Sequence, residues 1–102
     1  MTIKQQSGLN DKTLSIIARI LKPYHEKIDR YGLFGSRATG QYRDNSDIDL
    51  VICGTIDQDD LNKLRLDFEE SYIPYTVDII HYETINEPAL KNHIDQVFLP
   101  LH

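Results

Sequence analysis

The chain has 102 residues with 40% hydrophobic and 26% charged residues, which is ordinary for one globular domain spanning residues 1–102. Its formal net charge of −5 argues against binding of nucleic acid through a broad basic surface. There is no apolar run of the roughly 20 residues that cross a bilayer, no signal-peptide pattern, and a lone cysteine, Cys53. We therefore expect a cytoplasmic protein that binds no membrane.

The first half of the chain predicts a helix, a strand and a short turn. Residues 10–22 carry an apolar stripe at helical spacing, Leu14, Ile17, Ala18 and Leu21, with Asn10 or Asp11 available as a cap. Residues 28–34 are a strand candidate, residues 36–40 fit a short helical turn, and residues 41–46 form a polar loop.

The second half predicts two strands and two helices. Residues 47–53 and 75–82 are β-branched and apolar, as in strands. Residues 57–71 carry one apolar stripe behind an acidic first turn, and residues 87–98 have a proline in the first turn, so both predict helices. The alternation of helices and strands predicts an α/β domain in which helices cover a small sheet.

Two aspartates stand one residue apart on the strand predicted at residues 47–53. Because successive side chains of a strand point to opposite faces, Asp47 and Asp49 point the same way. Ile48, Leu50 and Ile52 point to the other face, into a core. Adjacent carboxylates repel each other unless a positive charge lies between them, and a divalent metal is the simplest candidate. Mg²⁺ prefers oxygen ligands of this kind. The alternative is that Asp47 caps a turn while Asp49 lies at a solvated edge.

A third acid, Asp78, stands alone in the apolar strand predicted at residues 75–82. An aspartate in such a run is costly to bury unless it is paired or binds a metal. If the two strands are neighbours, three carboxylates converge, and such a cluster can hold two metals about 3.5–4 Å apart for an in-line phosphoryl displacement. Asp47 and Asp49 then bind the cations, and Asp78 contacts one of them and helps to deprotonate the attacking hydroxyl.

The turn at Gly35-Ser36 follows an apolar strand end. Glycine permits close backbone approach, and free N–H groups at the start of a helix suit an anion. The Ser36 hydroxyl and the Arg37 guanidinium are further candidates to bind phosphate oxygens of a nucleotide. The spacing is not that of a P-loop, and a plain turn with a helix cap is the alternative.

These features together resemble a known family. The stretch "FGSRATG…SDIDLVI" has a Gly-Ser pair, ten residues, and an Asp-x-Asp pair. It resembles the minimal nucleotidyltransferase (MNT) domains of the DNA polymerase beta-like nucleotidyltransferase superfamily, over roughly residues 28–80. Small stand-alone domains of this kind resemble the antitoxins of HEPN/MNT toxin–antitoxin pairs.

The resemblance implies a fold, a site and a reaction. The fold is a mixed β-sheet with helices packed on it. Gly35 and Ser36 would hold the triphosphate of ATP, Asp47 and Asp49 would coordinate one or two Mg²⁺, and Asp78 would match the third acid. The implied reaction is transfer of AMP from ATP onto a tyrosine of a HEPN-domain toxin, an RNase, which neutralises it within a hetero-oligomer.

Two other functions stay open. The chain could be a non-catalytic antitoxin that acts by binding alone, or a nucleotidyltransferase subunit that modifies a small molecule such as an antibiotic, with a partner subunit supplying the acceptor pocket. The complete set of predicted site residues favours catalysis over the first. The lack of room for a substrate domain disfavours the second.

Overall fold

The structure, a computed structural model, describes residues 1–101 and contains a four-stranded sheet in the order β3-β2-β1-β4. Strand β1 (Ile28–Phe34) runs antiparallel to β2 (Ile48–Gly54) and to the short β4 (Leu99–Pro100). Strand β3 (Val77–His81) runs parallel to β2. The sheet is therefore mixed, as the family resemblance implies.

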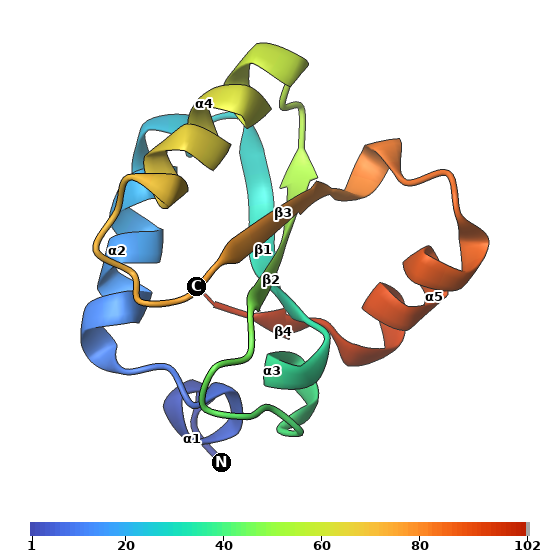
Figure 1. The fold of residues 1–102 in the computed structure, drawn as a ribbon. Coiled ribbons are helices and arrows are strands. Elements are labelled where there is room, and N and C mark those ends of the chain that lie inside the picture. The colour runs from blue at the N-terminus through green and yellow to red at the C-terminus, as the bar shows by residue number, and fades with distance from the viewer. Residues whose placement is uncertain (102) are drawn as a thin grey trace.

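The helices form layers on both faces of this sheet (Figure 1). Helices α2 and α4 cover one face, α5 lies on the other, and α1 and α3 lie together at one end. The helices are α1 (Ile3–Ser7), α2 (Asp11–Leu21), α3 (Ser36–Thr39), α4 (Gln58–Glu69) and α5 (Pro88–Val97), with single 3₁₀ turns at Lys22–Tyr24 and Tyr82–Thr84. Among residues 1–101 no helix is long and apolar enough to cross a membrane.

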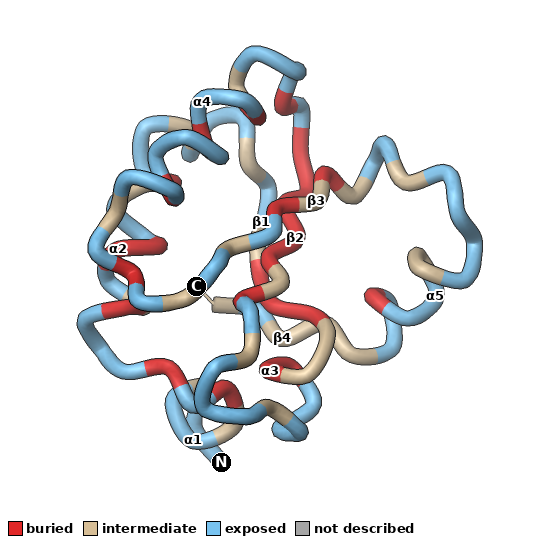
Figure 2. The backbone as a smooth tube through the Cα atoms, viewed as in Figure 1, coloured by how far each residue is buried: buried red, intermediate tan, exposed pale blue. Residues whose placement is uncertain are grey.

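Strand β2 is the centre of the core, as its buried colour in Figure 2 shows. Ile48, Leu50 and Ile52 are all fully buried and belong to the cluster covered by α2 and α4. Val51 points to the other face, where it packs with Phe34 and with residues of α5. The predicted alternation along this strand is therefore confirmed, and it fixes the face on which Asp49 lies.

Helix α2 forms where the sequence predicts it, and the Asn10 side chain caps it by accepting a hydrogen bond from the Thr13 N–H at 2.9 Å. The predicted stripe is partly wrong, because Ala18 is exposed. The buried residues of the helix are Thr13, Ile16, Ile17 and Leu21. Ile16 is the larger apolar side chain, so burying it removes more apolar surface from water than burying Ala18 would.

Candidate active site

Two of the predicted site carboxylates lie side by side. Asp49 of β2 and Asp78 of β3 are paired positions of the parallel ladder, so their side chains project from the same face, the one that α5 lies on. Asp47 comes two residues before Asp49, just ahead of β2, and is exposed like Asp78, whereas Asp49 is half-buried. The sheet register thus brings together acids that are distant along the chain.

The Gly35 turn lies directly against one of these carboxylates. Its φ of 73° is in the left-handed region, and a Cβ on this residue would overlap Oδ2 of Asp49. Phe34, the residue before the turn, is the cross-strand partner of Asp49 in the antiparallel ladder. Only glycine allows the turn and the carboxylate to come this close.

The acids influence one another electrostatically. Burial raises the pKa of Asp49 above its usual value, and the negative charges of Asp78 and Asp47 raise it further. His93 of α5 opposes that shift. Ionised Asp49 is therefore unfavourable in this environment, and a bound cation would favour it.

His93 belongs to this site but was not among the predicted residues. Its ring meets Phe34 edge-on, with 6.5 Å between ring centroids. Helical periodicity could have indicated His93, because it lies three residues after Leu90 and four before Val97, both packed toward the sheet.

The residues present fit a magnesium ion bound together with a substrate. Within residues 1–101 no three His, Cys, Asp or Glu side chains are arranged to hold a metal by themselves. Mg²⁺ in nucleotide enzymes commonly takes one or two carboxylates, with waters and substrate phosphates completing the octahedron. The paired Asp49 and Asp78, with Asp47 beside them, offer oxygen donors of this kind.

Arg37, which is a predicted phosphate contact, is a buried residue. Its side chain is only 1% exposed, and it is used inside the chain. Nε and Nη2 both donate to the carbonyl of Ser46, at 3.1 and 3.0 Å, and Nη1 donates to the carbonyl of Ser7 at 2.8 Å. These bonds occupy the guanidinium inside the chain and favour a structural role, and its direct contact with a nucleotide stays a prediction.

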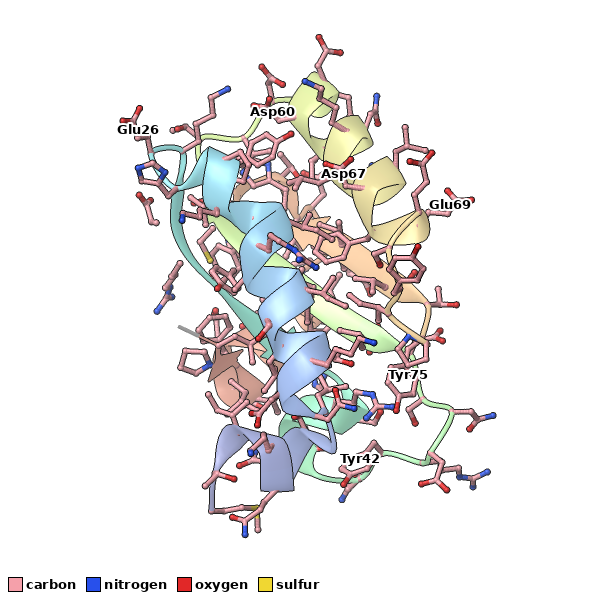
Figure 3. The ribbon with its side chains drawn as sticks, turned by 90° about the vertical axis from the view of Figure 1, so that its left-hand side faces the viewer. Glu26, Tyr42, Asp60, Asp67, Glu69 and Tyr75 are labelled. Carbon is pink, nitrogen blue, oxygen red and sulfur yellow. The ribbon has the colours of Figure 1, made fainter. Side chains whose placement is uncertain are left out.

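Two aromatic rings complete the surroundings of this guanidinium. Its Cζ atom lies 5.1 Å from the ring centroid of Tyr42 and 4.3 Å from that of Tyr75. Figure 3 shows both tyrosines at the same end of the molecule, near α1 and α3. Contacts of a cation with aromatic faces offset part of the cost of burying its charge.

The position of Arg37 in the chain gives these contacts a structural consequence. Arg37 follows Ser36 of the turn, and its acceptor Ser46 precedes Asp47. One side chain therefore bridges the two ends of the ten-residue loop between the turn and the aspartate pair. We call this bridge the Arg37 clamp.

Comparison with known families and proteins agrees with the geometry. The family model described as polymerase beta, nucleotidyltransferase, matches residues 16–98. A protein of Methanocaldococcus jannaschii, provisionally named a protein adenylyltransferase, is 32% identical over 97 residues, which cover 83% of this chain and 94% of that protein.

Solved structures share the fold. A toxin–antitoxin structure with AMP-PNP matches at a TM-score of 0.71 and 22% identity, covering 87% of this chain and 72% of that one. A mutant of the toxin–antitoxin pair MntA-HpeT matches at 0.71 and 21%, covering 92% and 73%. A structure provisionally described as a minimal nucleotidyltransferase matches at 0.62 and 25%, covering 98% and 96%. The fold inferred from the sequence is thereby confirmed.

Proposed function

The chain belongs to the polymerase beta nucleotidyltransferase family, and from that premise we propose that it is an antitoxin that transfers AMP from ATP onto a tyrosine of a HEPN-domain toxin. The observation that carries the proposal is the pairing of Asp49 with Asp78 beside the glycine turn. In this arrangement a turn suited to phosphates adjoins carboxylates suited to cations, as nucleotidyl transfer requires.

The relatives support the choice of donor and acceptor. The M. jannaschii relative is named a protein adenylyltransferase, which favours AMP as the group transferred and a protein as the acceptor. One structural neighbour is a toxin–antitoxin with AMP-PNP, an ATP analogue, and another is the pair MntA-HpeT. A toxin is therefore our preferred partner, and the chain and its partner would form a hetero-oligomer in the cytoplasm.

The nucleotide half of the site is the turn at Gly35 and Ser36. Gly35 caps α3, and the first N–H groups of any helix have no partner within the helix. Ser36 is half-buried, so its hydroxyl and N–H can reach a phosphate oxygen. The Arg37 clamp contributes by holding this turn relative to Asp47.

The metal half consists of Asp47 and Asp49, with Asp78 beside them. Mg²⁺ bound there with the substrate phosphates would neutralise charge on the phosphate oxygens and lower the barrier to displacement. The protein's own contribution is rigidity, because Asp49 stands between fully buried residues of β2. Each carboxylate is held by a strand of the sheet rather than by a loop tip, apart from Asp47, which the clamp secures.

In the proposed reaction the tyrosine oxygen of the acceptor bonds to the α-phosphorus of ATP. The bond between the α-phosphorus and the bridging oxygen breaks, and pyrophosphate leaves with that electron pair. Asp78 is exposed at the edge of the site and accepts the hydroxyl proton. The 102 residues act here as a single minimal domain, and the partner supplies the acceptor.

The test is incubation of the chain with Mg²⁺, ATP labelled at the α-phosphate, and the HEPN-domain protein encoded beside it. We expect label on a partner tyrosine, located by mass spectrometry, and loss of labelling with Asp47→Asn and Asp49→Asn. Persistence of labelling in both variants would contradict the proposed site. If variants that transfer no label still neutralise the partner, an antitoxin that acts by binding alone is favoured.

A further inference from the structure

The outer edge of β3 is a second feature next to the paired aspartates. In the described sheet β3 is an end strand, and no further strand pairs with its outer edge. At the other end of the sheet the short β4 pairs with Gly32 and Leu33 and so covers part of the outer edge of β1. Figure 1 shows this edge between α4 on one side and α5 on the other. An uncovered strand edge presents backbone N–H and C=O groups that can pair with another extended chain.

The hydrogen-bond pattern identifies which backbone groups point outward. The N–H of Ile48 donates to the carbonyl of Thr76 at 2.9 Å, so position 76 and every second residue after it face β2. Val77 and Ile79 therefore direct their N–H and C=O groups away from the sheet. At Ile79 the carbonyl accepts a hydrogen bond from Nη2 of Arg65 at 3.3 Å, which marks one end of the open stretch.

A groove follows this edge. It consists of two adjoining cavities of about 950 and 380 Å³ that share Arg65, Ile79 and Ile80 as lining residues. The larger one extends along β3 to Asp78 and is bounded on the helical side by Phe68 and Glu69. An elongated space beside an open strand has the shape that an extended peptide needs.

We propose that the β3 edge binds an extended segment of the protein substrate as an additional strand, which delivers the acceptor hydroxyl to Asp78. This inference rests on the proposed function and specifies how its acceptor is recognised. Neighbouring strands lie about 4.8 Å apart, and residues opposite each other project from the same face. A tyrosine opposite Asp78 would therefore lie beside Asp78, on the same face as the Asp78–Asp49 pair.

A second copy of the chain fits this edge less well. If the β3 edges of two copies paired about a two-fold axis, each contact would occur twice. The Asp78 side chains of both copies would then lie in the same short ladder of paired strands. Like charges across strands are destabilising. A substrate strand that places a neutral tyrosine beside Asp78 avoids this repulsion.

Hydrogen exchange resolved by residue tests the edge directly. The probe is the toxin partner that is labelled in the transfer experiment, mixed with the chain, Mg²⁺ and a non-hydrolysable ATP analogue. We expect the N–H groups of Val77 and Ile79 to gain protection, while those of Asp78 and Ile80, which already face β2, change little. Unchanged exchange at Val77 and Ile79 would overturn the proposal, as would equal protection in concentrated chain without partner.

A substitution pair provides the functional test. Val77 is the first residue of β3 and its N–H points outward, so proline is tolerated there by the sheet while removing one edge donor. We expect Val77→Pro to raise the KM for the partner roughly tenfold, the equivalent of one lost backbone hydrogen bond, with kcat unchanged at saturation. Val77→Ala shortens the side chain but keeps the donor, and its KM should stay near that of the wild type.

The outcomes separate the two proposals. Both variants should bind the ATP analogue with wild-type affinity and unfold at similar temperatures, which excludes general damage. Equal KM values for Val77→Pro and the wild type overturn edge binding and leave the proposed function intact. Failure of the wild type to label the partner contradicts the proposed function. It also contradicts binding of an acceptor at the β3 edge, because that proposal rests on the same function.

Discussion

Asp49 of β2 and Asp78 of β3 are directly opposite each other in a parallel strand pair, and the glycine turn lies against the first of them. Burial raises the pKa of Asp49, and the negative charge of Asp78 raises it further unless a cation is present. Ionised Asp49 therefore makes the folded chain less stable than a neutral side chain would, and the same carboxylate is part of the proposed metal site. That trade between stability and function can be measured.

Asp49→Asn should abolish AMP transfer and yet stabilise the metal-free protein at pH 7. The pKa of Asp49 is raised above its usual 3.8 mainly by burial, so the folded chain binds a proton there more tightly than the unfolded chain does. Above the raised pKa, ionised Asp49 lowers stability, and asparagine removes that effect. We expect a higher melting temperature than that of the wild type, measured with a chelator present.

The pH dependence of this gain follows from the same shift. The difference in melting temperature between Asp49→Asn and the wild type should shrink as the pH falls through the raised pKa. Below 3.8 the wild-type side chain is protonated in both states, and the gain should vanish. A variant that is less stable than the wild type at pH 7 would contradict the assigned environment of Asp49.

Asp78→Asn should reduce the rate of transfer while leaving stability almost unchanged. Asp78 is exposed, so its charge costs little in the folded state. As the base that accepts the hydroxyl proton it would contribute about 10²- to 10⁴-fold to kcat. The measurement is kcat at saturating ATP and partner, and Asp67→Asn, an exposed acid on α4, is the control expected to keep full activity. A wild-type kcat in Asp78→Asn would refute its role as the base.

The strands that carry the acids were predictable because their signals are local. Alternation along β2 and the lone Asp78 follow from side-chain period and from the cost of burying a charge. The parallel pairing of β2 with β3 depends on how the sheet assembles. The sequence therefore predicts that the three carboxylates converge only if these two strands are neighbours. The short α1 and the two-residue β4 were not predicted, because neither is long enough to produce a periodic pattern.

The environment of Arg37 was beyond sequence reasoning for a different reason. A guanidinium beside a phosphate-binding turn is normally a candidate for phosphate contact. Its actual acceptors are backbone carbonyls of Ser7 and Ser46, and its aromatic neighbours come from two further segments. Backbone carbonyls leave no mark in a sequence, so only the assembled fold reveals this environment.

Gly35→Ala should abolish AMP transfer, and its loss of stability should be too small to account for this. A Cβ at Gly35 would overlap the Asp49 carboxylate, and the backbone there, at φ 73° and ψ −154°, is in a region that essentially only glycine occupies. Gly40→Ala is the matched control, because Gly40 also has a positive φ, 82°, but its Cβ would meet nothing closer than 3.8 Å. Gly40→Ala should lose about 1–2 kcal/mol of stability from backbone strain in the left-handed helical region, and Gly35→Ala up to about 3 kcal/mol, because its backbone is less accessible to alanine.

The pair is read by comparing transfer rates under conditions where both variants remain folded. We expect Gly40→Ala to label the partner at a rate close to that of the wild type and Gly35→Ala to give no detectable label. Similar rates in the two variants would mean that the contact between the turn and Asp49 does not matter for the reaction.

Arg37→Met tests whether the Arg37 clamp holds the site together. Methionine keeps an apolar stem but leaves the carbonyls of Ser7 and Ser46 without their donors, so we expect a loss of about 2–4 kcal/mol in the free energy of unfolding, measured with urea. The loop before Asp47 loses its anchor, and kcat should fall with it. Arg43→Met, an exposed arginine of the same loop, should stay within about 0.5 kcal/mol of the wild type. If Arg37→Met instead keeps full stability and loses only affinity for ATP, Arg37 contacts the nucleotide directly, and the clamp is not its function.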